Sequence, residues 1–180
     1  MPNLYEAYNE SVDMVLHLGL TYNQQHYSLE ESAARDGYDE YADVDGQKFG
    51  ADDGQKRWPE GDSSLKTTLD FEAIYSGWRS NLLRTPEALS ALDGVVIRRN
   101  DGRGTFICDF VYYAMMAEYS KRRRLAAQVM EARPVLCLHM PGKPSLLNIK
   151  QCKVVVVTLL RAMAESWAKN NKSQQDTDVS

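Results

Sequence analysis

The sequence predicts an α/β fold, a three-layer α/β/α arrangement around a mixed, mostly parallel sheet. Short apolar runs typical of buried strands occur at residues 12–20, 95–99 and 135–138. Segments with helical spacing alternate with them, at residues 70–83, 109–119 and 148–168. Strands and helices in alternation favour parallel strands with helices packed on the faces of the sheet. A chain of 180 residues fits one such domain, which we place at residues 1–168.

The first predicted strand, VDMVLHLGL at residues 12–20, is a nearly continuous apolar run that Gly19 closes, as expected for a strand buried on both faces. Residues 35–64 are acidic and rich in glycine and show neither helical nor alternating periodicity, so we expect a long surface loop that acts as a lid or a binding loop. Residues 70–83 suit an amphipathic helix. Its apolar stripe contains Phe71, Ile74, Trp78 and Leu82.

The second strand, from Val95, leads into a glycine-containing loop and the helix at 109–119, and the third strand is stopped at Pro141 and Gly142. The run VVVV within residues 148–168 alone would indicate a strand, but apolar spacing over about five turns favours a helix. From Lys169 onward the chain is polar and aperiodic, which predicts a disordered tail at residues 169–180.

Composition excludes several classes of function. A net charge of -4 without a broad basic region argues against nucleic acid as a partner, and no apolar run is long enough to span a membrane. The N-terminal sequence lacks the basic and apolar regions of a signal peptide, so we expect a cytoplasmic protein. The odd number of cysteines, Cys108, Cys137 and Cys152, without metal-type spacing, predicts free thiols and neither metal nor cofactor.

Cys108 occupies a position suited to chemistry. In the segment GRGTFICDFVYY, residues 102–113, it stands at the junction of a glycine-containing loop and the predicted helix. Unpaired N–H groups and the positive end of the helix dipole would stabilise a thiolate there. The alternative is a small buried residue filling a gap beneath the helix, which is the more common role of a lone cysteine.

Three polar residues follow predicted strands. Glu30 lies in the segment after the strand at 12–20, Cys108 in the turn after the strand at 95–99, and His139 at the end of the strand at 135–138. Open α/β sheets place their sites beyond the carboxyl ends of strands. Thiol, imidazole and carboxylate form the set that nucleophilic acyl transfer requires. We expect His17 to be a hydrogen-bonded core residue, and His26 to lie in the polar loop.

These residues carry a resemblance to a known family. The GRGTFICDFVYY segment resembles the nucleophile motif of the type I pyroglutamyl peptidases (pyrrolidone-carboxylate peptidases), and VLCLHMP resembles their histidine motif. Residues 15–30 resemble the family's V-H-x-G strand followed by a glutamate, and DGY at 36–38 and DVDG at 43–46 resemble the eukaryotic, fungal-like branch. The resemblance covers roughly residues 4–166. It implies a phosphorylase/hydrolase-like fold and a cysteine omega peptidase that removes pyroglutamate from the N-termini of peptides, with catalytic Cys108, His139 and Glu30.

The sequence also departs from the family. The N-terminal strand and the aromatic loop that packs on the lactam ring have no counterpart, so we expect a domain truncated at its N-terminus. An arginine that helps to hold the oxyanion in bacterial members is replaced by Glu40, with Arg35 as the nearest candidate, and that role stays open. The alternative function is therefore a non-catalytic or truncated relative that keeps the triad but lacks the pocket. The uncovered edge of the first strand predicts self-association into homo-oligomers.

Overall fold

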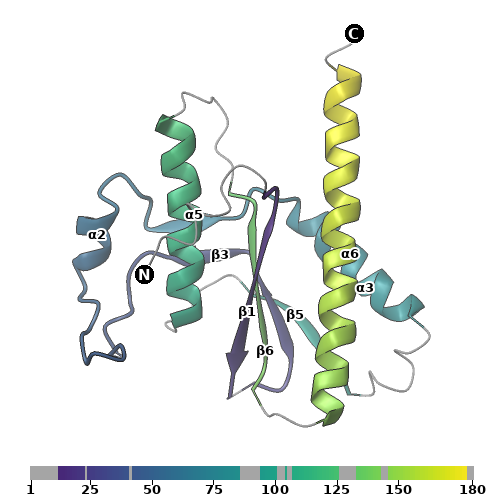
Figure 1. Ribbon diagram of the computed structural model, residues 1–180, viewed down its shortest axis with the longest axis horizontal. Coiled ribbons are helices and arrows are strands. Elements are labelled where there is room, and N and C mark those ends of the chain that lie inside the picture. Colours follow the sequence, from purple (N-terminus) through teal and green to yellow (C-terminus); the bar gives the residue numbers. More distant parts are fainter. Residues whose placement is uncertain are drawn as a thin grey trace.

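The computed structural model describes residues 12–22, 24–40, 42–85, 94–100, 104, 107–125, 133–142 and 146–177. Within these ranges a mixed sheet is flanked by helices on both faces, and Figure 1 shows the three layers, with α5 on one side of the sheet and α3 and α6 on the other. The predicted three-layer α/β class is confirmed. Most of the loop at 101–106 and the segments at 1–11, 86–93 and 126–132 lie outside the described residues.

The sheet contains four strands in the order β1-β6-β2-β5. They are β1 (Val15–Thr21), β6 (Val135–Pro141), β2 (Tyr27–Glu30) and β5 (Ile97–Asn100). The pairs β1·β6 and β2·β5 are parallel, whereas β2 and β6 are antiparallel. The sheet is therefore mixed and mostly parallel, as predicted, but its two halves run in opposite directions.

Strand β1 corrects one expectation. It lies at an edge of the sheet and pairs with β6 alone among the described strands, and Leu18 and Leu20 are 51% and 57% exposed. It is therefore not buried on both faces. Gly19 does not close the strand either, because pairing with β6 continues to Thr21.

Helices α3 (Phe71–Arg84) and α6 (Leu146–Thr177) pack together against one face of the sheet. The side chain of Asp70 caps α3 by accepting a hydrogen bond from the backbone N–H of Ala73, which supports the predicted start of this helix. Trp78 is completely buried and donates a hydrogen bond from Nε1 to the carbonyl of Val155 in α6. The valine run is thus helical, because the long apolar face of α6 covers the sheet.

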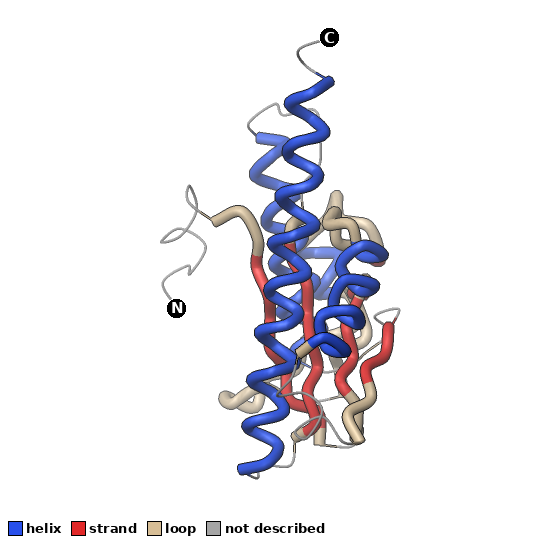
Figure 2. Tube along the Cα trace, turned by 90° about the vertical axis from the view of Figure 1, so that its right-hand side faces the viewer, coloured by secondary structure: helices blue, strands red, loops and turns tan. Residues whose placement is uncertain are grey.

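Residues 169–177, which the sequence predicts to belong to a disordered tail, continue α6 beyond the body of the molecule (Figures 1 and 2). The segment contains neither Gly nor Pro, and a helix already anchored by packing adds further residues without a new nucleation step. Residues 178–180 lie outside the described part of the chain. None of the helices that the structure describes combines the length and apolarity needed to cross a membrane.

The opposite face of the sheet is covered by α5 (Ile107–Leu125), which begins two residues earlier and ends six residues later than predicted. A small hairpin of β3 (Ser32–Ala34) and β4 (Ser64–Lys66) packs beside it. The expected long loop at 35–64 connects these two strands and contains one short helix, α2 (Asp53–Arg57). Its aromatic side chains pack back onto α5, so the loop is more firmly attached than its composition predicts.

Candidate active site

Four polar side chains share the face of the sheet that α5 covers. Glu30 of β2 pairs opposite Cys137 of β6, and Ser28 pairs opposite His139. Because side chains alternate between the faces of a sheet, all four of these residues point toward α5. The intervening Leu29, Leu136 and Leu138 point the other way, into the core beneath α3 and α6. Alternation along two short strands therefore places an acid and a base side by side.

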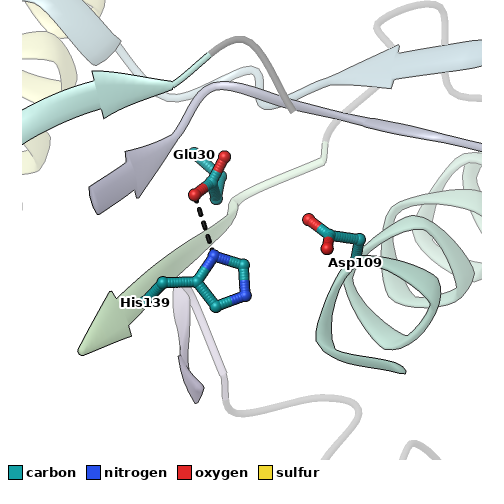
Figure 3. A group of neighbouring side chains, drawn as sticks. All are labelled: Glu30, Asp109 and His139. Carbon is teal, nitrogen blue, oxygen red and sulfur yellow. Dashed lines mark hydrogen bonds and ion pairs between the residues drawn. The ribbon is translucent and has the colours of Figure 1, made fainter. Parts of the chain in front are cut away.

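Glu30 and His139 form a buried pair. Glu30 is 0% exposed and its Oε1 lies 2.8 Å from Nδ1 of His139, which is 6% exposed (Figure 3). The hydroxyl of Ser28 donates a second hydrogen bond to the same oxygen, at 2.9 Å. Binding of Nδ1 by a carboxylate orients the ring and leaves Nε2 for a reacting group.

Cys108 approaches the imidazole from α5. It lies in the first turn of the helix, is partly exposed, and interacts with His139 closely enough to raise the pKa of the imidazole. Burial lowers the pKa of His139, but the hydrogen bonds with Cys108 and Glu30 and the charges of Glu30 and Asp109 outweigh it and raise the pKa to about 10. The imidazole therefore holds its proton at neutral pH.

Gly19 brings β1 against both reactive groups. A methyl group added at its Cα would lie 2.8 Å from Sγ of Cys108 and 2.8 Å from Cδ2 of His139. No side chain larger than hydrogen fits there without moving them. The glycine was predicted only as the end of a strand, although its place in the V-H-x-G pattern was a signal that it belongs to the site.

The thiol opens onto a small cleft between β1 and α5, with a volume of about 160 Å³. Its lining comprises His17, Leu18, Gly19, Ile107, Cys108, Val111 and Cys137. His17 contacts the sulfur of Met115 and burial lowers its pKa, but the side chain is only partly buried and lines the cleft instead of the expected core. His26 is partly exposed near Arg98 and Glu30, outside the pair formed by Cys108 and His139.

Several further residues of the CDFVYY segment hold α5 in place. The hydroxyl of Tyr112 lies 3.2 Å from the carbonyl of Glu30 and 3.3 Å from that of Val135. Tyr113 donates to the carbonyl of Asp62 in the long loop, at 2.7 Å. The two tyrosines, both fully buried, thus join the helix that carries Cys108 to the sheet and to the loop.

The open question of an oxyanion-binding side chain is not answered by Arg35 or Glu40. The guanidinium of Arg35 pairs with Asp36 and donates to the carbonyl of Gly61, and Glu40 is exposed. The first turn of α5, which carries Cys108, leaves backbone N–H groups without partners inside the helix, and such groups can hold an oxyanion.

Contrary to expectation, Glu30, Cys108 and His139 do not meet at the carboxyl ends of parallel strands. Strands β2 and β5 run opposite to β6, so their carboxyl ends do not meet that of β6 at one edge. Glu30 reaches His139 across the face of the sheet instead, from a strand that was not predicted.

Glu30, Asp109 and His139 also have donor atoms within 4.8 Å of one another, a set that could ligate a metal ion, although Nδ1 of His139 is already bonded to Glu30.

Comparison with solved structures identifies the fold. Pyroglutamyl peptidase I from Bacillus amyloliquefaciens matches with a TM-score of 0.59 and 21% identity, covering 87% of this chain and 70% of that chain. Pyrrolidone carboxyl peptidase from Thermus thermophilus matches with a TM-score of 0.54 and 19% identity, covering 88% and 73%. That from Pyrococcus furiosus matches with a TM-score of 0.57 and 17% identity, covering 86% and 70%.

Sequence comparison adds nothing to this, since neither a protein-family model nor a curated protein matches the chain. The chain therefore has the fold of the pyrrolidone carboxyl peptidases, as the sequence motifs predicted.

Proposed function

We propose that the chain is a member of the type I pyroglutamyl peptidase family and a cysteine omega peptidase that removes N-terminal pyroglutamate from peptides. The observation that carries the proposal is the order of groups on His139, with the carboxylate of Glu30 on Nδ1 and the thiol of Cys108 as its other partner. This order is the one that nucleophilic acyl transfer uses. The shared fold supports the substrate class.

In the proposed reaction, the Cys108 thiolate attacks the pyroglutamyl carbonyl while N–H groups at the start of α5 hold the oxyanion. The amide C–N bond breaks and imidazolium His139 gives its proton to the departing amine, leaving a thioester on Cys108. Water then attacks the thioester, His139 takes a proton from the water, and the thiolate leaves. Glu30 holds the imidazole in orientation through both steps.

The cysteines are consistent with a cytoplasmic location, which we also propose. All three are free, and a reducing compartment keeps a catalytic thiol in its reactive form. The small cleft beside Cys108 offers an apolar lining from Leu18, Ile107 and Val111, which suits an uncharged lactam better than a charged residue.

The test is release of a fluorophore from a pyroglutamyl amide, with the corresponding prolyl amide as the matched substrate control. We expect cleavage of the pyroglutamyl substrate alone, and loss of at least about 1000-fold in rate for Cys108→Ala, by analogy with other nucleophile removals. An inactive chain whose Cys108 still reacts with iodoacetamide would favour the alternative, a non-catalytic relative without a competent pocket. Cleavage that persists in Cys108→Ala would rule out the thiol mechanism.

A further inference from the structure

Asp109 is a charged residue at the site that the proposed mechanism does not use. It follows Cys108 in the first turn of α5 and is 1% exposed. Figure 3 shows its carboxylate directed from the helix toward Glu30 and His139, and oxygen and nitrogen atoms of these three residues lie within 4.8 Å of one another. His139 therefore faces two carboxylates, one from the sheet and one from the helix.

Burial and close packing fix the position of the Asp109 carboxylate. An aspartate in the first turn of a helix is ordinarily explained by the helix dipole, which also stabilises a solvent-exposed carboxylate and so does not require burial. Asp109 is instead buried, and burial of a carboxylate costs several kcal/mol unless nearby charges or donors compensate. Gly104 packs against it so closely that a methyl group on Gly104 would lie 2.0 Å from Oδ2.

We propose that Asp109 is a positioning residue for His139, whose negative charge acts together with that of Glu30 to keep the imidazole protonated until it transfers its proton. The inference rests on the proposed function and deepens it. Asp109 acts through His139 and touches no reacting atom. Its influence is greatest during hydrolysis of the acyl-enzyme, where the thiolate has been consumed and the carboxylates stabilise the imidazolium that forms as His139 takes a proton from water.

The groups that face the imidazole support this role. Glu30 from β2 and Cys108 and Asp109 from α5 each favour its protonated form. Cys137, on the same face of β6, is fully buried, and burial followed by the charges of Glu30, Asp109 and Cys108 raises its pKa, so it stays neutral. His17 of β1 lines the adjacent cleft, and its lowered pKa keeps it neutral as well. The charge around His139 is therefore set by Glu30, Cys108 and Asp109.

The test measures the protonation of the His139 ring directly by NMR. The chain contains three histidines, so ring ¹⁵N signals in a histidine-labelled protein can be assigned with His17→Gln and His26→Gln. We expect the titration midpoint of His139 in the wild-type protein to lie well above pH 6.5. In Asp109→Asn, which keeps size and hydrogen-bonding capacity but removes the charge, the midpoint should fall by about 1 to 3 units. Asp109→Glu should restore most of the shift, and the exposed Asp52→Asn should change nothing.

Gly104→Ala provides a second approach without changing a charged group, because its methyl group must displace the Asp109 carboxylate. We expect it to lower the His139 midpoint in the wild-type background and to add little in Asp109→Asn. The proposal is overturned if wild-type His139 titrates at or below 6.5, or if folded Asp109→Asn keeps the wild-type midpoint. The titration needs no substrate, so its outcome is independent of whether pyroglutamyl peptides are cleaved.

If pyroglutamyl peptides are cleaved, the same variants should distinguish a positioning role of Asp109 from a purely structural one. Asp109→Asn should move the alkaline limb of the pH profile of kcat to lower pH, whereas a residue that only stabilises the helix would leave the limb in place. Loss of activity with an unchanged limb would contradict the proposal.

Discussion

Oε1 of Glu30 lies 2.8 Å from Nδ1 of His139, although 109 residues separate them in the chain. The second oxygen of Glu30 is buried and has no hydrogen-bond partner among the described residues. Oε1 is thus the hydrogen-bond partner of both the imidazole of His139 and the hydroxyl of Ser28. A carboxylate desolvated in this way stabilises the imidazolium strongly, because no water screens their attraction.

This pair predicts how the stability of the protein depends on pH. The pKa of His139 is about 10 in the folded chain against 6.5 in an unfolded one, so its stabilisation is fully present below pH 6.5. It is lost as pH rises from 6.5 through 10, at about 1.4 kcal/mol for each unit of pKa difference. We expect Glu30→Gln to have a lower free energy of unfolding than wild type, and the difference between the two proteins to decrease as pH rises from 6.5 to 10. Thermal unfolding at several pH values measures it.

The control for that experiment is Glu40→Gln, which changes an exposed carboxylate in the long loop. Its difference from wild type should be small at every pH, since exposed charges contribute little to stability. A gap between Glu30→Gln and wild type that stays constant from pH 6.5 to 10 would show that the pair is not ionised as described.

Gly19→Ala should disable the site while leaving the fold. The added methyl group would lie 2.8 Å from both Sγ of Cys108 and Cδ2 of His139, so one of them must move. Misplacement by about 1 Å can cost 100-fold in rate. We expect a loss of at least that size in pyroglutamyl amide cleavage. Gly77→Ala is the matched control, because its methyl would meet only Ala162 at 3.4 Å and α3 should gain helix propensity.

The three cysteines should differ in reactivity. Cys108 is partly exposed at a helix start, whereas burial raises the pKa of the Cys137 thiol and Cys152 pairs with the hydroxyl of Tyr27 at 3.3 Å. Iodoacetamide at neutral pH should therefore label Cys108 first, as mapped by mass spectrometry. Preferential labelling of Cys137 or Cys152 in the folded protein would contradict the assignment of the nucleophile.

Parts of this architecture could be predicted because their patterns are long. The helical spacing over residues 148–168 outweighed the β-branched run, and the stripe from Phe71 to Leu82 matches the buried face of α3. The strand β2 was missed because it is four residues long. Its alternation of Tyr27 and Leu29 with Ser28 and Glu30 was the available signal, but four residues are too few to separate a strand from a turn.

The geometry of the site depends on features that local pattern does not carry. Strand direction is decided by connections and packing, so nothing in the sequence showed that β2 runs antiparallel to β6. The role of Gly19 depends on contacts with residues far along the chain, and that of Asp109 depends on burial. Family motifs indicated the same Cys108, His139 and Glu30 as the strand-end argument, because motifs record such long-range contacts indirectly.

Tyr112→Phe should weaken the connection between α5 and the sheet. Its hydroxyl is hydrogen-bonded to the buried carbonyls of Glu30 and Val135. Removing the partner of a buried polar group lowers the free energy of unfolding by about 1 to 3 kcal/mol. We expect reduced stability in urea unfolding together with a several-fold lower kcat/KM, because the backbone that carries Glu30 loses a constraint. Tyr113→Phe should lower stability similarly but leave kcat/KM near wild type, since its partner Asp62 lies in the loop. Equal effects of the two variants on kcat/KM would show that Tyr112 does not position Glu30.

Trp58 anchors the long loop between β3 and β4 to α5. Its buried indole contacts Phe49, Phe110 and Tyr113, with ring centroids 6.3, 6.0 and 5.1 Å away, and its Nε1 has no hydrogen-bond partner among the described residues.

Trp58→Ala should therefore cost about 3 to 5 kcal/mol and open residues 35–63 to limited proteolysis. Trp58→Phe keeps an aromatic ring while removing the unsatisfied N–H, so it should stay within about 1.5 kcal/mol of wild type. If the loop acts as the expected binding loop, Trp58→Ala should also raise KM for the pyroglutamyl amide at temperatures where it remains folded. An unchanged KM with a proteolysed loop would show instead that the loop only covers the aromatic face of α5.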